Sequence, residues 1–383
     1  MSMLEPKRLN KAVVSESLIP HPSPASLQPT RLALHVSPSL TAIILLIHLH
    51  LLLLLLQANG DASSCSVYIA SGSHIYKLRI ALEDSVVGQG KQNLLIPERT
   101  EVLESFVVDR CPHRSEIQSI ALAETENKGC SLLGSVDSHG DLIVSQLDAC
   151  NTDIDGSTYS VSPRDCGVGE GSWAGLCFNP SQLSMAATAR SFCKSIDVYD
   201  HDIHLRTLRT LGFPTSLIFM DSFKESGGSM LATTEGSQLS VWDLRVKENG
   251  GCVQRIMGSV GNMLYTVSIS SSGNIAVGGE DRTVTVYDPR RWCATSRWLN
   301  CSKYEITGLC FSSVDPNYLY VQGVDYEIMC GQWRESEKAF SFRGDSNWLG
   351  FSKCSDRDIL AGWCDSGSIF VADASEKNVE MHV

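Results

Sequence analysis

Two stretches of the chain, Met230–Arg245 (MLATTEGSQLSVWDLR) and Ile275–Arg290 (IAVGGEDRTVTVYDPR), share one pattern. Each begins with small and apolar residues, turns at an acidic or glycine-containing segment, continues with alternating residues and ends in aromatic–Asp–X–Arg. Alternation predicts a half-buried strand, and a short turn between two such runs predicts a hairpin. Trp242 and Tyr287 occupy equivalent places 45 residues apart. The sequence therefore predicts a repeated unit of antiparallel strands.

Copies of this unit can be followed along most of the chain. Their third strands end at positions 39 to 52 residues apart, namely Leu147, Tyr199, Trp242, Tyr287, Trp333 and Ala372. An early unit over residues 40–80 brings the number to seven. The spacing leaves room for a fourth strand in each unit, for example in Leu205–Leu211 and Lys338–Phe342. Seven such units can close a ring, which protects their edge strands.

The repeat resembles that of the WD-repeat family of β-propellers. Trp242-Asp243 is the literal dipeptide of that family, and Tyr287-Asp288 is a close variant. The Gly-His dipeptide that usually opens such repeats is absent, so the chain looks like a divergent member. In the family this His joins a turn Asp in a hydrogen-bond network, and its loss implies greater reliance on apolar packing. The resemblance implies an all-β, seven-bladed propeller.

The composition excludes several classes of protein. The chain has 383 residues, of which 43% are hydrophobic, and a formal net charge of −12. It can therefore bury a large core, and it lacks the overall basic charge that a nucleic-acid-binding surface needs. The 14 cysteines include no C-x-x-C pair, which favours a reducing compartment over a zinc or redox site. The triplet Asn300-Cys301-Ser302 leaves a secretory location open.

The N-terminal segment allows several interpretations. Residues 1–39 are rich in Ser, Pro and Leu, and predict a disordered leader or an organelle-targeting peptide ahead of a propeller over residues 40–383. The apolar run Leu40–Leu56 predicts either a Leu-rich first strand or a membrane anchor. A cytoplasmic or nuclear location is expected, with a membrane-anchored or organelle-targeted protein as the alternative.

The Asp-X-Arg ends are the most specific candidate site. In some WD-repeat proteins, consecutive ends of this kind mark substrate receptors of cullin–RING ubiquitin ligases, which dock on a propeller-containing adaptor. The resemblance therefore implies that Asp243, Arg245, Asp288 and Arg290 lie on adjacent blades and that the two arginines pair with adaptor carboxylates. Alternatively, each Arg binds only a neighbouring loop.

Three other motifs have plainer interpretations. His201-Asp202-Ile203-His204 contains metal-ligand types, but residues three apart on a strand face opposite ways, so a solvated connection is favoured. The segment from Asp137 to Asp141 contains Ser, His and Asp, but adjacent residues suit a hairpin turn better than a catalytic triad. Arg343-Gly344-Asp345 is expected to be a turn. We therefore expect no enzyme activity, no metal and no cofactor.

These patterns favour a protein-interaction scaffold or adaptor within a larger complex. The partners are expected to be other proteins, and no nucleic acid is expected. The substrate receptor of a cullin–RING ligase is the sharper alternative. A membrane-tethered propeller is a second alternative, which requires Leu40–Leu56 to span a bilayer.

Overall fold

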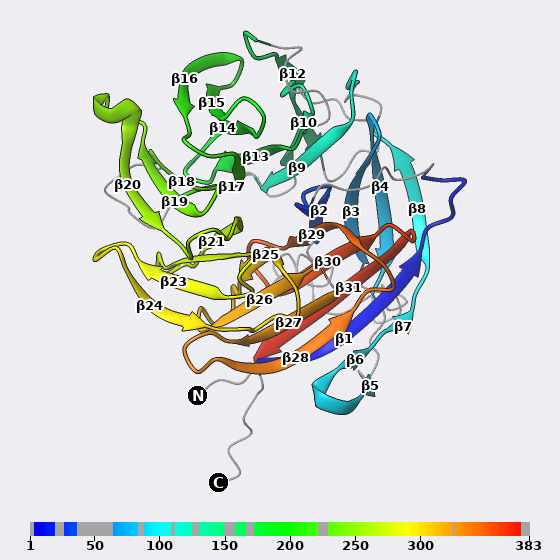
Figure 1. Cartoon of the computed structure of the whole chain (residues 1–383). Coiled ribbons are helices and arrows are strands. Elements are labelled where there is room, and N and C mark those ends of the chain that lie inside the picture. Colours follow the sequence, from blue (N-terminus) through cyan, green and yellow to red (C-terminus); the bar gives the residue numbers. More distant parts are fainter. Residues whose placement is uncertain are drawn as a thin grey trace, which may run out of the picture.

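The computed structural model describes residues 4–19, 27–36, 64–82, 88–108, 112–124, 130–148, 158–165, 172–220, 229–324 and 326–376. These residues form seven blades around a common axis, which is the expected seven-bladed β-propeller (Figure 1). Each blade has four antiparallel strands, and the last one carries in addition a two-residue strand that pairs in parallel with its fourth strand. Within the described ranges there is no α-helix. The first strand of each blade lies nearest to the axis and the fourth lies at the periphery (Figure 1).

Five blades are each built from four strands that are consecutive in the chain. Blade 2 contains β9 (Ile117–Glu124), β10 (Cys130–Asp137), β11 (Leu142–Asp148) and β12 (Thr158–Val161). Blade 3 contains β13 (Ala174–Asn179), β14 (Gln182–Arg190), β15 (Ser195–Asp200) and β16 (Ile203–Arg209). Blade 4 contains β17 (Pro214–Phe219), β18 (Met230–Glu235), β19 (Gln238–Asp243) and β20 (Cys252–Met257). β16 overlaps the stretch Leu205–Leu211, in which a fourth strand was expected.

Blades 5 and 6 repeat this arrangement. Blade 5 contains β21 (Leu264–Ile269), β22 (Ile275–Gly279), β23 (Val284–Asp288) and β24 (Cys293–Trp298). Blade 6 contains β25 (Ile306–Phe311), β26 (Tyr318–Gly323), β27 (Glu327–Gln332) and β28 (Glu337–Arg343). Both Asp-X-Arg stretches therefore lie where the sequence pattern placed them, at the ends of third strands.

The remaining two blades are assembled from less regular stretches. Blade 1 contains β2 (Leu32–Val36), β3 (Ser64–Ser71), β4 (His74–Ala81) and β8 (Val102–Val107). Blade 7 contains β29 (Trp348–Lys353), β30 (Ile359–Cys364), β31 (Ser368–Glu376) and β1 (Leu4–Val13). Three two-residue strands lie between β4 and β8: β5 (Gly88–Gln89), β6 (Leu95–Ile96) and β7 (Glu98–Arg99).

The two ends of the chain close the ring in blade 7. β1 pairs antiparallel with β31 from Leu4 opposite Glu376 to Val13 opposite Ser368. Arg8 adds an ion pair with Asp373 at 2.9 Å, in which both side chains are mostly buried. Because the N-terminal strand supplies the outer place of the last blade, the ring cannot open without breaking this ladder of hydrogen bonds.

We expected a disordered or targeting leader over residues 1–39. This expectation is wrong for the part of the segment that the structure describes. β1 and β2 both lie in this segment, one in blade 7 and the other in blade 1. In β1, Leu9 and Ala12 are buried while Lys7 and Val13 are exposed, so the segment contributes to the core in spite of its polar composition. The propeller therefore begins near residue 4 rather than at residue 40.

The run Leu40–Leu56 lies outside the described residues. We expected this run to form the first strand of blade 1. That position is occupied by β2, which pairs with β3 from Leu32 opposite Ile69 to Val36 opposite Cys65. The Leu-rich strand interpretation is therefore wrong for that position. In the described ranges, no helix is long and apolar enough to cross a membrane.

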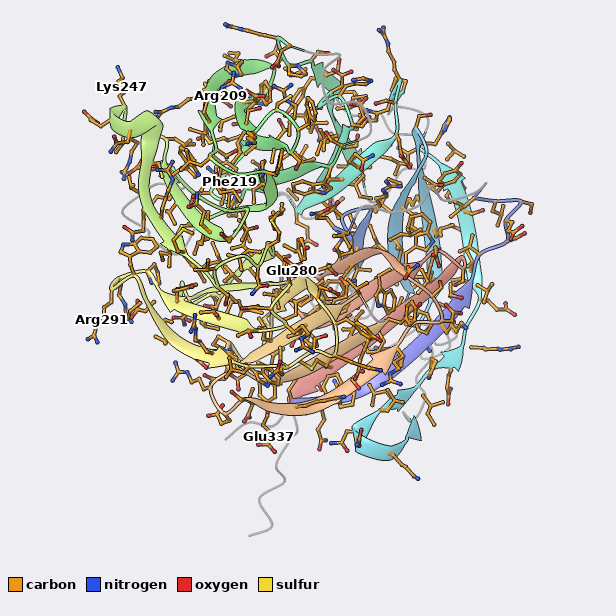
Figure 2. The ribbon with its side chains drawn as sticks, viewed as in Figure 1. Arg209, Phe219, Lys247, Glu280, Arg291 and Glu337 are labelled. Atoms are coloured by element: carbon orange, nitrogen blue, oxygen red, sulfur yellow. The ribbon has the colours of Figure 1, made fainter. Side chains whose placement is uncertain are left out.

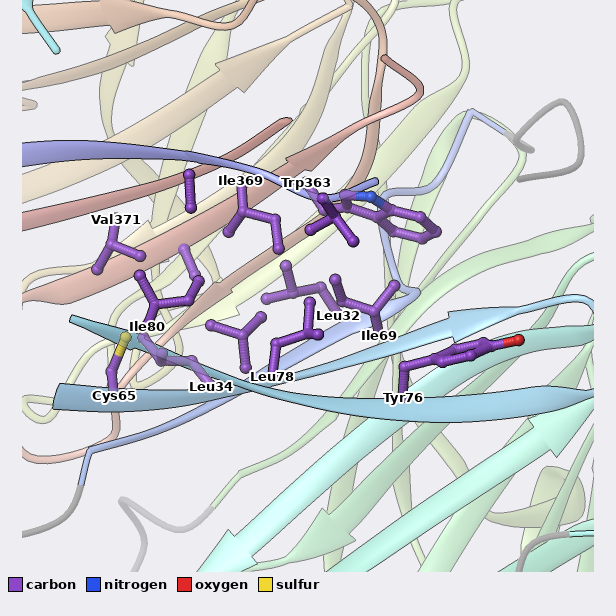
Figure 3. Packing of buried hydrophobic residues seen from close by; sticks show 14 of the residues in the cluster. Leu32, Leu34, Cys65, Ile69, Tyr76, Leu78, Ile80, Trp363, Ile369 and Val371 are labelled. Carbon is purple, nitrogen blue, oxygen red and sulfur yellow. The ribbon is translucent and has the colours of Figure 1, made fainter. Parts of the chain in front are cut away.

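The core consists of apolar side chains that interleave between neighbouring blades. At the contact of blades 7 and 1, Leu34 and Leu78 face Ile369 and Val371 (Figure 3). Each fully buried side chain of this size contributes roughly 1.5–3 kcal/mol relative to its exposed state. Trp242 and Tyr287, the aromatic residues of the two boxes, are likewise buried in contacts between blades. The aromatic positions of the repeat thus fix the boxes to the core.

The antiparallel order of strands separates the connections into two faces. The turns after the first and third strands lie on one face, here called the box face, which includes residues 244–251 and 289–292. The turns after the second strands and the connections between blades lie on the other, here called the loop face, which includes residues 210–213, 258–263 and 299–305. Any partner that contacts both groups of residues must therefore reach around the ring.

Candidate functional site

The two Asp-X-Arg boxes lie on the box face of adjacent blades. Asp243 is the last residue of β19 and Asp288 the last residue of β23, and both are buried beneath their arginines. The side chains of Arg245 and Arg290 are 57% and 79% exposed. The structure therefore presents one exposed guanidinium group from each of two neighbouring blades.

The two boxes have the same internal geometry. Asp243 Oδ1 accepts hydrogen bonds from the backbone N–H of Arg245 at 2.9 Å and from its Nε at 3.0 Å, and Oδ2 accepts from Nη2 at 2.8 Å. The corresponding three distances from Arg290 to Asp288 are all 3.0 Å. Such bidentate pairing fixes the plane of a guanidinium group. It leaves the Nη1 edge of each arginine directed away from its own aspartate.

These contacts keep the four groups ionised. Hydrogen bonds from Arg245 lower the pKa of the Asp243 carboxyl below its usual value, and Arg290 has the same effect on the pKa of Asp288. The aspartates raise the pKa of the two arginines in return. At neutral pH each box is thus a neutral pair whose cation is at the surface.

More cations surround the boxes than the motif itself contains. Lys247 and Arg291 follow the two boxes and project from the outer rim of blades 4 and 5 (Figure 2). Glu248 is an exposed acidic residue in the first connection. This rim is therefore locally basic on a chain whose formal net charge is −12.

A third box follows on blade 6, where the acidic residue is replaced by Gln332. The Gln332 amide donates to the Tyr318 hydroxyl at 2.7 Å, so it does not take the place of the aspartate. Arg334 instead lies over the ring of Trp333, with 4.9 Å between the guanidinium carbon and the ring centroid. Arg290 and Arg334 both line a depression of about 520 Å³ between blades 5 and 6.

Polar networks on the loop face were missed by the sequence reasoning, which noted only that Gly-His is absent. In blade 2, His113 Nε2 lies 2.7 Å from Ser135 Oγ, and His113 Nδ1 lies 3.3 Å from Asp137 Oδ2. The dipeptide Pro112-His113 ahead of a strand was the available signal. The arrangement has the order of a catalytic triad, but Ser135 is fully buried. A substrate cannot reach that hydroxyl, so the network supports the blade.

Other blades use different residues in the same region. Glu235, fully buried at the end of β18, accepts from the backbone N–H of Leu211 at 2.5 Å and of Gly212 at 2.8 Å. In blade 5, Ser259 donates to Asp281 at 2.7 Å. The blades therefore rely less exclusively on apolar packing than the missing Gly-His implied.

The remaining sequence motifs have structural partners. His204 lies 3.3 Å from Asp197, whereas His201 lies in the turn after β15 with 65% of its side chain exposed. Asp137 Oδ1 accepts from the N–H groups of His139 and Asp141, as a hairpin turn requires. Asp345 of the Arg-Gly-Asp tripeptide binds Lys11 at 2.7 Å. Each motif is used within the fold.

Neither metal-ligand clusters nor disulfides occur in the part of the chain that the structure describes. Burial raises the pKa of several thiols there, to about 12 for Cys65 and Cys301 and to about 11 for Cys354. These thiols are therefore protonated at neutral pH and unreactive as thiolates.

Comparison with models of protein families finds no match for the chain, and comparison with curated protein sequences finds none either. The propeller and its boxes therefore rest on the geometry described above.

Proposed function

We propose that this propeller is a non-catalytic scaffold or adaptor that binds other proteins, and that it is a divergent WD-repeat propeller. Propellers commonly serve as interaction platforms, and their function is carried by surface sites rather than by the fold. The single observation that supports a scaffold best is the apolar surface of the loop face. Exposed large side chains there follow one another from blade 3 to blade 6: Phe192, Leu211, Phe213, Met257, Val260, Leu299, Tyr304 and Tyr326.

Several of these side chains are exposed to an extent that is costly in water without a partner. Val260 is 92% exposed, Leu211 is 64% exposed and Phe213 is 48% exposed. Exposed apolar side chains that gather on one face favour protein binding there, and aromatic side chains are enriched among the residues that dominate affinity. We therefore assign partner binding to the loop face.

The test is affinity purification of the tagged protein followed by mass spectrometry. A loop-face variant, Leu211→Ser with Val260→Ser, should lose partners that the unaltered protein recovers. Both side chains are exposed and contribute little to the core, so the fold should remain intact. A matched variant at the box-face ends of two outer strands, Ile203→Ser with Val253→Ser, alters two other exposed apolar side chains and serves as the control. Equal recovery by all three proteins would overturn the assignment.

The second candidate is a substrate receptor of a cullin–RING ubiquitin ligase. The observation that favours it is the identical conformation of the two boxes, which presents Arg245 and Arg290 from adjacent blades. In this proposal Asp243 and Asp288 fix the arginines, and the arginines pair with carboxylates of a propeller-containing adaptor. The loop face, on the other side of the ring, remains accessible to a substrate.

Reversal of both charges, Arg245→Glu with Arg290→Glu, should lower recovery of a cullin and its adaptor by about tenfold or more, because paired charges become repulsive. The control is Arg164→Glu with Lys303→Glu, which reverses two exposed charges in connections on the loop face. Undiminished recovery with the box variant, or an equal loss with the control, would exclude adaptor docking through the boxes.

For the location we propose the cytoplasm or nucleus. The support is that ten described cysteines are free thiols, which suits a reducing compartment. Cell fractionation tests this against the alternatives of organelle targeting and of a membrane tether through Leu40–Leu56. Recovery in the carbonate-resistant membrane fraction would favour the tether.

A further inference from the structure

Arg334 differs from the other two box arginines in having no carboxylate of its own. Where blades 4 and 5 have Asp243 and Asp288, blade 6 has Gln332, whose amide binds Tyr318. Among the residues that the structure describes, no acidic side chain forms an ion pair with Arg334. The third box therefore presents a cation that is not neutralised from within.

The position of Arg334 is nevertheless restricted. Its guanidinium group lies 4.9 Å from the centroid of the Trp333 ring, a cation–π contact. Trp333 is itself buried, and its Nε1 donates to the Pro316 carbonyl at 2.9 Å. A planar guanidinium stacked on a fixed ring keeps its N–H donors free at the edges. Arg334 is thus pre-oriented without using its donors.

The depression in front of Arg334 is lined by polar groups from two blades. Blade 5 contributes Arg290 with Asp288, and also the small polar side chains Ser272, Asn274, Thr295 and Ser296. Blade 6 contributes Trp333 and Arg334. The Ser296 hydroxyl donates to the Trp333 carbonyl at 2.8 Å, which ties the two walls together. The volume of about 520 Å³ admits one or two side chains of a partner.

The charges that line this depression select the ligand. Among the charged side chains that line the depression, Arg290 and Asp288 neutralise each other at 3.0 Å, so the charge of Arg334 is left over; the exposed Glu335 and Glu337 follow it in the chain but do not line the depression. One unbalanced positive charge matches one carboxylate. A phosphate monoester carries about −1.5 to −2 charges at neutral pH and needs more than one uncompensated cation. Arg290 adds a free Nη1 edge as a donor.

We propose that the depression between blades 5 and 6 binds an acidic side chain, Asp or Glu, in an extended segment of a partner protein, with Arg334 as its main anchor. This inference rests on the proposed role in binding proteins and names the chemistry of one partner site. It extends the box face beyond the four residues of the Asp-X-Arg boxes to a third blade.

The test uses the purified full-length protein and a fluorescein-labelled hexaglutamate peptide, followed by fluorescence anisotropy at low salt. The unaltered protein should bind this peptide and not a hexaglutamine peptide. Arg334→Gln should weaken binding by about two- to fivefold, the range measured for exposed ion pairs. Arg164 is an exposed arginine on the loop face, so the Arg164→Gln variant should bind the hexaglutamate peptide as tightly as the unaltered protein does.

A second variant tests the cause of the effect. Gln332→Asp gives blade 6 the aspartate of the other boxes, and should reduce peptide binding as much as Arg334→Gln because the new carboxylate captures the arginine. Equal binding by Arg334→Gln and the unaltered protein would overturn the proposal. Tighter binding of a phosphoserine peptide than of hexaglutamate, with the same dependence on Arg334, would overturn the choice of a carboxylate.

The peptide-binding test and the adaptor-recovery test can fail independently of each other. If charge reversal at Arg245 and Arg290 leaves adaptor recovery intact while Arg334→Gln loses the peptide, adaptor docking fails and the acidic-peptide site stands. If the peptide binds the Arg334 variants unchanged while adaptor recovery depends on the two boxes, the reverse holds.

Discussion

On the box face, Asp243 and Asp288 each bind an exposed arginine two residues further along the chain. On the loop face, Asp137 and Glu235 are fully buried, and they accept hydrogen bonds from backbone N–H groups and from side chains of other strands. All four side chains are carboxylates, but their partners differ in separation along the chain and in exposure. The carboxylates of the box face orient cations at the surface, and those of the loop face fasten connections between strands.

The different roles of the two groups of carboxylates follow from the hydrogen-bond donors that each would leave unpaired if it were removed. If Asp243 were removed, Arg245 would still be solvated, because it is more than half exposed. If Glu235 were removed, the fully buried hydroxyl of Ser240 would lose its acceptor, and so would the N–H groups of Leu211 and Gly212. An unsatisfied buried donor costs more than an exposed ion pair contributes. The two faces should therefore separate function from stability, and the following experiments can break or sharpen that contrast.

The largest effect is expected at Glu235. Glu235→Ala should lower the free energy of unfolding by about 3 kcal/mol, because two N–H donors and the Ser240 hydroxyl lose a charged acceptor. Urea unfolding monitored by circular dichroism measures this change. The matched box-face variant, Asp243→Ala, should change the urea midpoint much less. Equal losses in the two variants would remove the distinction between the faces.

A smaller effect that depends on pH is expected at Asp137. Burial raises the pKa of its carboxyl, but hydrogen bonds from His113 and Ser115 lower it more, so the pKa lies below its usual value. A depressed folded-state pKa stabilises the protein above the unfolded-state value near 3.9, and this contribution is lost as the pH falls through the folded-state pKa.

Asp137→Asn should therefore lower the Tm by roughly 2–4 °C at pH 7, and the difference from the unaltered protein should shrink below about pH 4. Thermal unfolding between pH 3 and pH 7 measures it. A difference that stays constant down to pH 3 would show that the ionised carboxylate is not the stabilising form.

The smallest effect on stability is expected at Asp288. Asp288→Asn should leave the Tm unchanged within about 2 °C, since its arginine is 79% exposed. The same change releases Arg290 and adds one positive charge to the depression beside Arg334, so it should tighten binding of the hexaglutamate peptide by about threefold. Anisotropy titration measures this gain. A weaker affinity would indicate that the orientation of Arg290 matters more than its charge.

The sequence predicted blades 2 to 6 closely but not the assembly of the first and last blades. Each of blades 2 to 6 is a run of consecutive strands with short turns, and the alternation of residues within them is a local signal. β1 and β31 are separated by almost the whole chain, and their pairing depends on closure of the ring. The polar, Ser- and Pro-containing N-terminal segment carries no local sign of that pairing.

The candidate site was predicted in part. The aromatic residue, the aspartate and the arginine of each box are adjacent in the chain, so their placement at the end of a third strand followed from the repeat. Their mutual hydrogen bonds did not follow, because an exposed arginine can bind its own box or another loop. The hydrogen bonds of His113 and Glu235 were missed, because the partners of His113 lie in β10 and those of Glu235 include the connection between β16 and β17.

The sequence by itself determined most strands beyond residue 64, the number of units and the position of the two Asp-X-Arg boxes, because these depend on alternation and on turn residues within about 45 positions of the chain. It also contained the replacement of an aspartate by Gln332. Only the tertiary structure decided that the N-terminal strand completes blade 7 and that Arg334 and Arg290 line one depression. Ring closure and contacts between blades bring together residues whose order in the chain does not encode their distance.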